Sequence, residues 1–251
     1  MKQLNPIIIE ATDFGDAWFQ ALYNVLHHGR SFKIDRGSYE GQTRLELDFV
    51  TIHITYPWLR DLDCGLPLIP IIPEHMDIPA PVTKEYVAEY VQYLMSHEKR
   101  EGEQYTYGQR LCRATVPSSN IDDIYDINIT WLNQIEYVIY TYQKYGWRNN
   151  QMVLQVAQPA DLLLSDPPCL RHIDTRIQDG ALHFYPYFRS WSMWGGFPAN
   201  LAGISVLQEY MASQLGVQHG EIIVTSKGLH LYDFEENIAR MRCMVKLNKV
   251  I

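Results

Sequence analysis

Four side chains of complementary chemistry stand close together within residues 166–200 of this sequence. Cys169 follows two prolines, Arg189 and Ser190 are adjacent, and Asn200 comes just after a Gly-Gly pair. A cysteine thiolate is a nucleophile, a guanidinium binds phosphate oxygens through paired N–H groups, and a side-chain amide both donates and accepts hydrogen bonds. Together these groups suit covalent chemistry on the ring of a nucleotide.

Two predicted strands place the cysteine beside the arginine. Residues 170–178 and 181–188 flank Asp179-Gly180, a pair typical of a two-residue hairpin turn. The start of the first strand then meets the end of the second, so we expect Cys169 and Arg189 to be neighbours. A reactive thiol needs a pKa below its usual value of about 8.5, and the arginine charge acts in that direction. Alternation places His183, Tyr185, Tyr187 and Arg189 on one face.

The elements that position these groups are predicted from periodicity and capping residues. We expect helices over 13–28, 83–97, 120–145, 199–215 and 234–241. We expect strands over 44–56, 152–156, 221–225 and 229–232. The proline-rich residues 57–82 predict an irregular connection, and the charged residues 98–103 predict a loop. Because long helices and strands do not alternate regularly, the sequence favours a single α+β domain over residues 1–251.

Composition argues against several other classes of protein. The chain has 251 residues, is 47% hydrophobic, and lacks an apolar run long enough for a membrane span. A net charge of −8 without clustered lysine or arginine argues against a nucleic-acid surface. Four widely separated cysteines favour neither structural zinc nor disulfides. We therefore expect a cytoplasmic protein without a metal, a membrane or a nucleic acid as its partner.

An ordered set of short motifs resembles the thymidylate synthase family. The motifs are Asp35-Arg36-Gly37, Tyr107-Gly108, Pro168-Cys169, Phe188-Arg189-Ser190, Gly196-Phe197-Pro198-Ala199-Asn200 and His230-Leu231-Tyr232. They cover about residues 35–232, and the compact length with the phrase 105–111 most resembles short archaeal-type members. The resemblance implies a large mixed sheet with flanking helices and a homodimer that forms through back-to-back sheets.

The resemblance also implies an activity and a set of residue roles. The reaction is reductive methylation of the nucleoside monophosphate dUMP to dTMP, with 5,10-methylenetetrahydrofolate as the reduced pterin. The implied catalytic residues are Cys169, Arg189 and Tyr107, with Cys169 as the nucleophile. The implied substrate-binding residues are Arg36, Arg148, Arg189, Ser190, Asn200, His230 and Tyr232. Ser192 and Gly196 are implied at the pterin.

Asn200 carries the expected choice of base. Its amide matches O4 and N3 of uracil, whereas relatives that act on cytosine carry an aspartate there. An asparagine before an apolar helical run is also typical of a helix N-cap, and both interpretations stay open. Trp191 and Trp194 either pack in the core or wall the pocket against water.

Two departures from the family pattern leave alternatives open. Ser192 stands where most members carry an aspartate that contacts the pterin, so a methanopterin-type donor is an alternative to folate. Asn149-Asn150 stand in place of an arginine pair from the partner subunit, and the adjacent Arg148 is a candidate substitute. Besides methylation, the alternatives are a dUMP or (d)CMP hydroxymethylase of the same fold and a nucleotide-binding homologue without catalysis. A ribonucleotide substrate also stays open.

Overall fold

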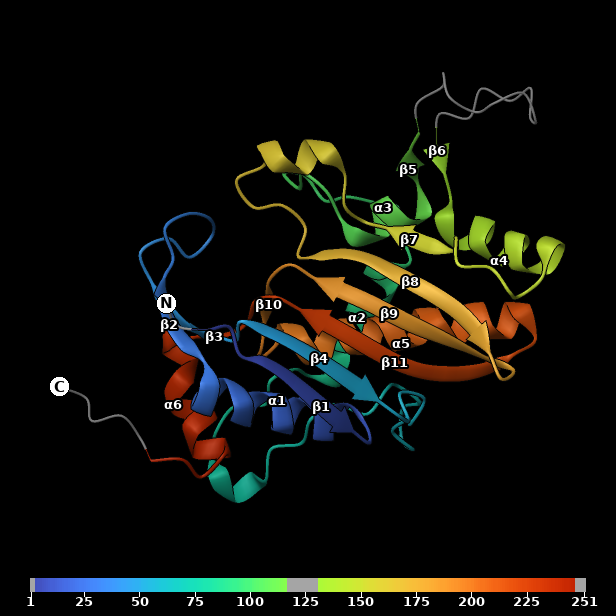
Figure 1. Ribbon diagram of the computed structural model, residues 1–251. Helices are drawn as coiled ribbons and strands as arrows, with labels where there is room; N and C mark the ends of the chain where they lie inside the picture. Colours follow the sequence, from blue (N-terminus) through green and yellow to red (C-terminus); the bar gives the residue numbers. More distant parts are fainter. Residues whose placement is uncertain (1–2, 117–130, 247–251) are drawn as a thin grey trace.

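A six-stranded mixed sheet forms the centre of the molecule (Figure 1), a computed structural model that describes residues 3–116 and 131–246. The strand order is β1 (Pro6–Ala11), β4 (Phe49–Ile54), β11 (Gln218–Ser226), β9 (Ala181–Phe188), β8 (Leu170–Gln178) and β7 (Val153–Gln155). β1 runs parallel to β4 and β11 runs parallel to β9, while the other neighbours are antiparallel. The predicted large mixed sheet is confirmed.

Two smaller sheets accompany it. One has four strands in the order β10 (Trp191–Ser192), β12 (Leu229–Tyr232), β3 (Thr43–Glu46) and β2 (Arg30–Lys33). The other pairs β5 (Ala114–Thr115) with β6 (Trp131–Leu132). Two passages from the six-stranded to the four-stranded sheet have no helix between their strands, β9 to β10 and β11 to β12, and we call these the sheet crossings. The two crossings are hydrogen-bonded, because the Trp191 N–H donates to the Gly228 carbonyl at 2.9 Å.

Helices cover one face of the central sheet (Figure 1). The helices are α1 (Phe14–His28), α2 (Lys84–Leu94), α3 (Tyr107–Cys112), α4 (Gln134–Tyr145), α5 (Gly196–Leu215) and α6 (Asp233–Arg242), and single 3-10 turns span Glu74–Met76 and Pro159–Leu163. α1 packs on β1 and β4, and α5 packs on β9 and β11. Within the described ranges, no helix is long and apolar enough to cross a membrane.

The core lies between this helical layer and the sheet. Alternate residues of β9, namely Leu182, Phe184 and Phe188, are fully buried against the helices. The intervening residues, such as Tyr185, are half-buried on the opposite face. The predicted alternation of the second hairpin strand is therefore confirmed, and the odd-numbered face of β9 is left without a helical cover.

Local sequence signals account for the elements nearest the site. Asp179 and Gly180 both have positive φ angles, of 52° and 77°, which is the requirement of a type I′ turn, so the predicted hairpin is confirmed. Thr83 caps α2 by accepting a hydrogen bond from the Tyr86 N–H at 3.2 Å. That helix ends at Leu94 and not at the predicted residue 97.

The predicted single strand over 44–56 is wrong. It is two strands, β3 and β4, that belong to different sheets and are separated by Leu47 and Asp48. Leu47 is buried, and the Asp48 carboxylate accepts a hydrogen bond from the Asn5 N–H at 2.8 Å and pairs with Arg30 at 2.6 Å. The Leu47 N–H still donates to the Leu229 carbonyl of β12 at 3.0 Å, so the chain leaves the four-stranded sheet at Asp48. The buried residues of β4 are therefore Val50, Ile52 and Ile54, and Phe49 faces outward.

The predicted long helix over 120–145 is also wrong in part. Trp131–Leu132 is a strand, and the helix begins at Gln134 after Asn133, whose side chain accepts from the Glu136 N–H at 3.3 Å. The asparagine cap explains the start, because its side chain satisfies an N–H group that lacks a helical partner. The part of the prediction over 120–130 lies outside the described residues.

Candidate active site

Cys169 lies immediately before β8, at the end of the central sheet. Its carbonyl accepts a hydrogen bond of 2.9 Å from the Arg189 N–H, which confirms that the two ends of the hairpin meet. Pairing between Leu170 and His172 is shifted by one residue, so Arg171 forms a β-bulge. Bulges redirect side chains at the ends of strands. The Cys169 side chain is half-buried here.

The thiol is held in its protonated form in the free protein. Burial raises the pKa of Cys169 above its ordinary value, and Asp166 adds to this. The charges of Arg189, Arg44 and Arg171 oppose it. The arginine therefore acts in the predicted direction, but desolvation outweighs its charge. The expected lowering of the thiol pKa is wrong for the chain without a ligand.

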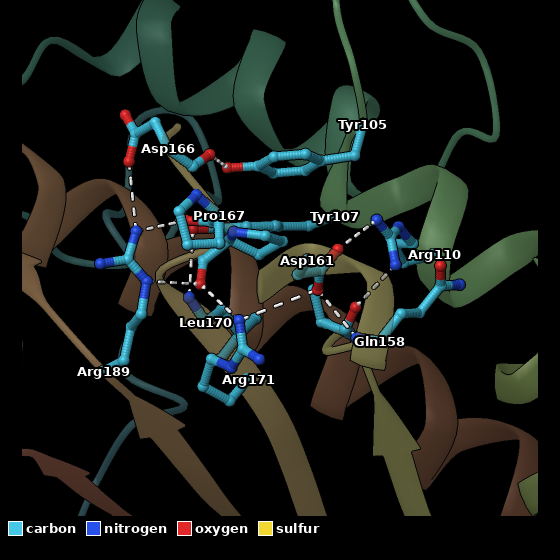
Figure 2. Close-up of polar contacts among 12 residues, drawn as sticks. Tyr105, Tyr107, Arg110, Gln158, Asp161, Asp166, Pro167, Leu170, Arg171 and Arg189 are labelled. Carbon is cyan, nitrogen blue, oxygen red and sulfur yellow. Dashed lines mark hydrogen bonds and ion pairs between the residues drawn. The ribbon is translucent and has the colours of Figure 1, made fainter. Parts of the chain in front are cut away.

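The guanidinium of Arg189 is bound by the residues just before Cys169 (Figure 2). Its Nη2 donates to the Asp166 carboxylate at 3.1 Å and also to the Pro167 carbonyl, and its Nε donates to the Pro168 carbonyl at 3.1 Å. These contacts fix the loop that carries the thiol. Nη1 has no hydrogen-bond partner within the described chain and stays available for an anion.

A cavity of about 420 Å³ opens beside this guanidinium. Its lining comes from β2, β3 and both sheet crossings: Phe32, Lys33, Ile34, Asp35, Arg36, Arg44, Glu46, Arg189, Ser190 and Lys227. Five of these residues are cationic and two are carboxylic acids, so the cavity suits a phosphate group. The structure thus brings Arg36, Arg189 and Ser190 together, as the sequence predicts.

His230 lies behind Ser190 on β12. Its Nδ1 is 2.8 Å from the Gly228 carbonyl, which can only accept, so Nδ1 carries the hydrogen. Burial lowers the pKa of His230 to about 4, so the ring is neutral near pH 7. Its Nε2 is then an acceptor, and it is buried without a hydrogen-bond partner in the described chain. An unpaired buried acceptor is costly, and a ligand hydroxyl would satisfy it.

Tyr232 continues the same face of β12. Its ring meets that of His230 edge-on, with 4.8 Å between centroids, so the two residues lie together as predicted. The ring also stacks on Phe234 at 5.4 Å. Burial raises the Tyr232 pKa to about 12, and its hydroxyl keeps its hydrogen at neutral pH.

Tyr107 is the first residue of α3 and reaches the base of β8 (Figure 2). Its hydroxyl accepts a hydrogen bond of 3.2 Å from the N–H of Leu170, the residue after the cysteine. Burial, followed by the Cys169 charge, raises the Tyr107 pKa well above its usual range. A neutral phenol beside the thiol can donate and accept a proton through its oxygen.

A buried ion pair anchors the segment that leads to Cys169. Arg110 of α3 pairs with Asp161 at 2.7 Å, and both side chains are buried (Figure 2). The second oxygen of Asp161 accepts from the Gln158 N–H at 2.8 Å. The loop before the thiol is therefore joined to the helix that carries Tyr107.

Asn200 lies inside α5, whose N-cap position is Gly195, so the N-cap interpretation is wrong. Its amide contacts Trp191 and Tyr90 instead. Trp191 is buried between the rings of Phe188 and Phe197, at 4.2 and 4.4 Å between centroids. Trp194 packs edge-on against Trp18 at 5.2 Å. Both tryptophans are core residues, and Trp191 also bonds the amide predicted to read the base.

Ser192 and Gly196, the residues expected at the pterin, are adjacent. Ser192 pairs with His230 in the four-stranded sheet, and Gly196 opens α5. A Cβ at Gly196 would lie 3.2 Å from that of Ser192, so the two elements approach closely. The hydroxyl and the unpaired N–H groups of the helix start give hydrogen-bond donors there.

Arg148 is the predicted residue that this chain does not bring to the site. It lines a separate cavity of about 560 Å³ with Arg176, Asp179 and Gly180, at the turn of the hairpin. A nine-residue strand such as β8 spans about 30 Å. The turn and Cys169 are therefore at opposite ends of the hairpin.

Sequence reasoning missed Arg44, Lys227 and Tyr90. Arg44 pairs with Glu46 at 2.5 Å and lies opposite Tyr232 in the β3–β12 ladder. Alternation within 43–46 is a local signal, but it does not indicate that the partner strand is β12, almost two hundred residues later. Lys227 belongs to a sheet crossing, and Tyr90 lies on a helix whose periodicity marks only a buried face. In the described chain no three His, Cys, Asp or Glu residues gather in a way that would hold a metal ion.

A thiol next to a cationic cavity is an arrangement that suits covalent attack on a phosphorylated substrate. The sequence profile of thymidylate synthase matches residues 84–246. The chain therefore belongs to the thymidylate synthase family, whose members bind a nucleotide and a pterin.

Archaeal relatives match over nearly the whole chain. A Methanosarcina acetivorans protein named "Putative thymidylate synthase" is 32% identical, covering 93% of this chain and 94% of the relative. One of the same name from Methanosarcina barkeri is 30% identical, with 93% and 94% covered. A third, from Methanothermobacter thermautotrophicus, is 25% identical, with 90% and 93% covered. The resemblance to the family's archaeal members is confirmed.

Proposed function

We propose that this chain is a thymidylate synthase that converts dUMP to dTMP through a covalent bond between Cys169 and C6 of the pyrimidine. The observation that carries the proposal is the position of Cys169 beside Arg189, which lines the cationic cavity and whose backbone N–H donates to the Cys169 carbonyl at 2.9 Å. Family membership supports the same reaction class.

The cavity would hold the 5′-phosphate. Arg189 offers Nη1, Arg36 reaches the same space, and the Ser190 hydroxyl lines it. Lys33, Arg44 and Lys227 add positive charge from outside the short sequence motifs. Asp166 competes for Arg189, so we expect the phosphate to displace the carboxylate as it binds. Charge-assisted hydrogen bonds of this type are stronger than neutral ones.

The sugar and base would extend from the cavity toward Cys169. Nε2 of His230 accepts from the 3′-hydroxyl, and the Tyr232 phenol completes that contact. Asn200 faces the base from α5, where its free N–H and free lone pair match O4 and N3–H of uracil. This assignment favours dUMP over dCMP.

Cys169 activates the ring. As the S–C6 bond forms, the electron pair of the C5–C6 double bond moves onto C5 and O4, and O4 takes up the proton that the thiol loses. The three arginines that oppose burial at Cys169 stabilise the sulfur charge. Tyr107, with its oxygen beside the thiol segment, is placed to accept or return the proton that C5 later loses.

The donor site fits a reduced pterin through its hydrogen-bond donors. Ser192 and the α5 start at Gly196 would hold it, but Ser192 brings no negative charge. When bound, 5,10-methylenetetrahydrofolate or a methanopterin-type analogue supplies the methylene carbon and the hydride. The neutral lining is equally compatible with either donor.

A homodimer is part of the proposal. The sheet face opposite α1 and α5 exposes apolar side chains, including Ile8, which is 76% exposed, and the half-buried Tyr185. Back-to-back packing of two such faces would cover them. In such a dimer Arg148 would act on the partner's phosphate cavity, since it lies far from its own.

Mass spectrometry tests the covalent step. Incubation with 5-fluoro-dUMP and methylenetetrahydrofolate should give a ternary adduct on the peptide that contains Cys169. Cys169→Ser should bind dUMP yet form no adduct, and Cys64→Ser, which changes an exposed cysteine, should behave as the unmodified protein. Turnover retained by Cys169→Ser would contradict the mechanism. A methanopterin-type donor should be assayed in parallel.

Product analysis separates the alternatives. Accumulation of hydroxymethyl-dUMP or hydroxymethyl-dCMP would identify a hydroxymethylase of the same fold. Binding of dUMP without any adduct would identify a homologue that has lost catalysis. Side-by-side assays with dUMP, UMP, dCMP and CMP would define both the base and the sugar.

A further inference from the structure

Three side chains from separate elements form a short hydrogen-bonded chain at the base-reading position. Nε1 of Trp191 is 3.0 Å from Oδ1 of Asn200, and Nδ2 of Asn200 is 2.7 Å from the hydroxyl of Tyr90. Trp191 comes from β10, Asn200 from α5 and Tyr90 from α2. Both ends of the amide are therefore engaged before any substrate arrives.

The chemistry of the three groups allows one direction only. An indole N–H can donate but never accept, so the atom of Asn200 that faces Trp191 must be the amide oxygen. The amide nitrogen then faces Tyr90 and donates to the phenol oxygen. Stacking between Phe188 and Phe197 immobilises Trp191, so the donor that sets this direction is fixed.

The phenol hydrogen of Tyr90 takes no part in these hydrogen bonds. Since its oxygen accepts from Asn200, its O–H points elsewhere, and it has no acceptor within the described chain. The ring packs against α5 at Gly203, where an added Cβ would lie 2.8 Å from Cε1 of Tyr90, so the tyrosine cannot swing in that direction. Burial raises the pKa of Tyr90 above its usual range. The hydrogen bond with Asn200 opposes this rise, and the charges of neighbouring tyrosines and Cys169 add to it.

We propose that Tyr90 is a specificity-determining residue, whose fixed O–H donates a hydrogen bond to the ring carbonyl O4 of the pyrimidine nucleotide. This rests on the proposed function, and deepens it by naming the group that selects a carbonyl. Uracil presents an acceptor at O4 and a donor at N3. Cytosine presents an amino group in place of O4, so two hydrogen-bond donors, that amino group and the Tyr90 O–H, would face each other.

Asn200 keeps a complementary part in this arrangement. Two contacts leave it one N–H and one lone pair, in the order that Trp191 dictates. Uracil would then receive donors from both Tyr90 and Asn200 at O4 and would donate N3–H to the amide oxygen. Trp191 acts as a positioning residue, because it touches the amide and not the base.

Calorimetric titration of Tyr90→Phe with dUMP and dCMP tests the assignment. Removal of the hydroxyl alone should weaken dUMP binding about tenfold, the equivalent of one net hydrogen bond, and leave dCMP binding equal or tighter. Tyr93→Phe is the matched control, because that hydroxyl lies on the same helix but bonds Glu103 at 2.5 Å. The control should retain the unmodified preference.

A second variant keeps the test decisive if Tyr90→Phe folds poorly, as judged by circular dichroism. Trp191→Phe removes the donor that orients the amide, so it should also reduce the preference for dUMP over dCMP. Unmodified protein that binds neither nucleotide would overturn the proposed function. Unmodified protein that prefers dUMP, with the preference unchanged in both variants, would overturn the role of Tyr90 alone.

Discussion

Asp166 holds the guanidinium of Arg189 through a contact of 3.1 Å, three residues before the thiol. The same carboxylate accepts from the Ser38 hydroxyl at 2.7 Å, and the Asp166 carbonyl accepts from Tyr105 at 3.1 Å. In the free protein, the exposed Asp166 carboxylate is therefore paired with the Arg189 guanidinium that we propose binds phosphate. It also raises the Cys169 pKa, after the larger effect of burial and against the arginine.

Asp166→Asn should tighten dUMP binding about three- to tenfold, because the phosphate no longer competes with a carboxylate for Arg189. Isothermal titration calorimetry at low salt measures it. Asp174→Asn, an exposed acid on β8 away from the cavity, is the control. An affinity that falls in Asp166→Asn and not in the control would show that the carboxylate helps the phosphate site.

Arg189→Ala should raise the Cys169 pKa further, because the largest charge opposing burial is removed. The rate of iodoacetamide labelling against pH, followed on the Cys169 peptide by mass spectrometry, reports this pKa. Peptide resolution is needed because Cys64 is exposed. Arg60→Ala is the control, because that guanidinium pairs with Glu209 at 2.7 Å and does not act on the Cys169 pKa, so the profile should stay in place. An Arg189→Ala profile that does not move would remove the electrostatic link between these residues.

His230 should make stability depend on pH in the acid range. Its pKa is about 4 in the folded protein, because of burial, against an ordinary value of 6.5. Below pH 6.5 the His230 ring binds a proton in the unfolded chain but not in the folded protein. Its contribution to the free energy of unfolding is therefore complete above pH 6.5 and is lost as the pH falls toward 4. Urea unfolding at pH 7.5 and pH 5 should show a smaller loss for His230→Asn, which keeps an N–H donor for Gly228. His27→Asn, on the exposed end of α1, should lose as much as the unmodified protein.

Gly108, next to Tyr107, should tolerate no side chain. An added Cβ would lie 2.2 Å from the Ser96 carbonyl oxygen and 2.3 Å from that of Tyr93, both of them backbone atoms. Gly108→Ala should therefore lower the free energy of unfolding by about 2 kcal/mol or more. Gly15 holds the same second position in α1, where a Cβ meets only the Asp13 side chain at 3.3 Å, and Gly15→Ala should be neutral or stabilising. Equal unfolding midpoints would contradict the close approach of α2 and α3.

The parts of the fold that depend on adjacent residues were predictable from sequence. Asp179-Gly180 specifies its own turn, and that turn alone brings Cys169 to Arg189. The division of 44–56 was not predictable, because it depends on Asp48 pairing with Arg30 and on distant strands. The net pKa of Cys169 was missed for a related reason. The sequence displays the charge of Arg189, whereas the burial that outweighs it arises only when α3 and both sheets assemble.

The site residues divide in the same manner. Arg36, Ser190 and His230 were predicted because each belongs to a recognisable short sequence motif. Tyr90 and Arg44 belong to no such motif and reach the site only through packing against Gly203 and pairing with β12. Partners of this second type become visible when the strand order is known.

The two sheet crossings have a mechanical consequence. Cys169 lies directly before β8 of the six-stranded sheet, while His230 and Arg44 belong to the four-stranded one. A nucleotide bonded covalently to the Cys169 sulfur and by a hydrogen bond to the His230 imidazole would therefore link the two sheets. Such a ligand would raise the melting temperature of the protein, and the rise would continue with the logarithm of the ligand concentration above its Kd.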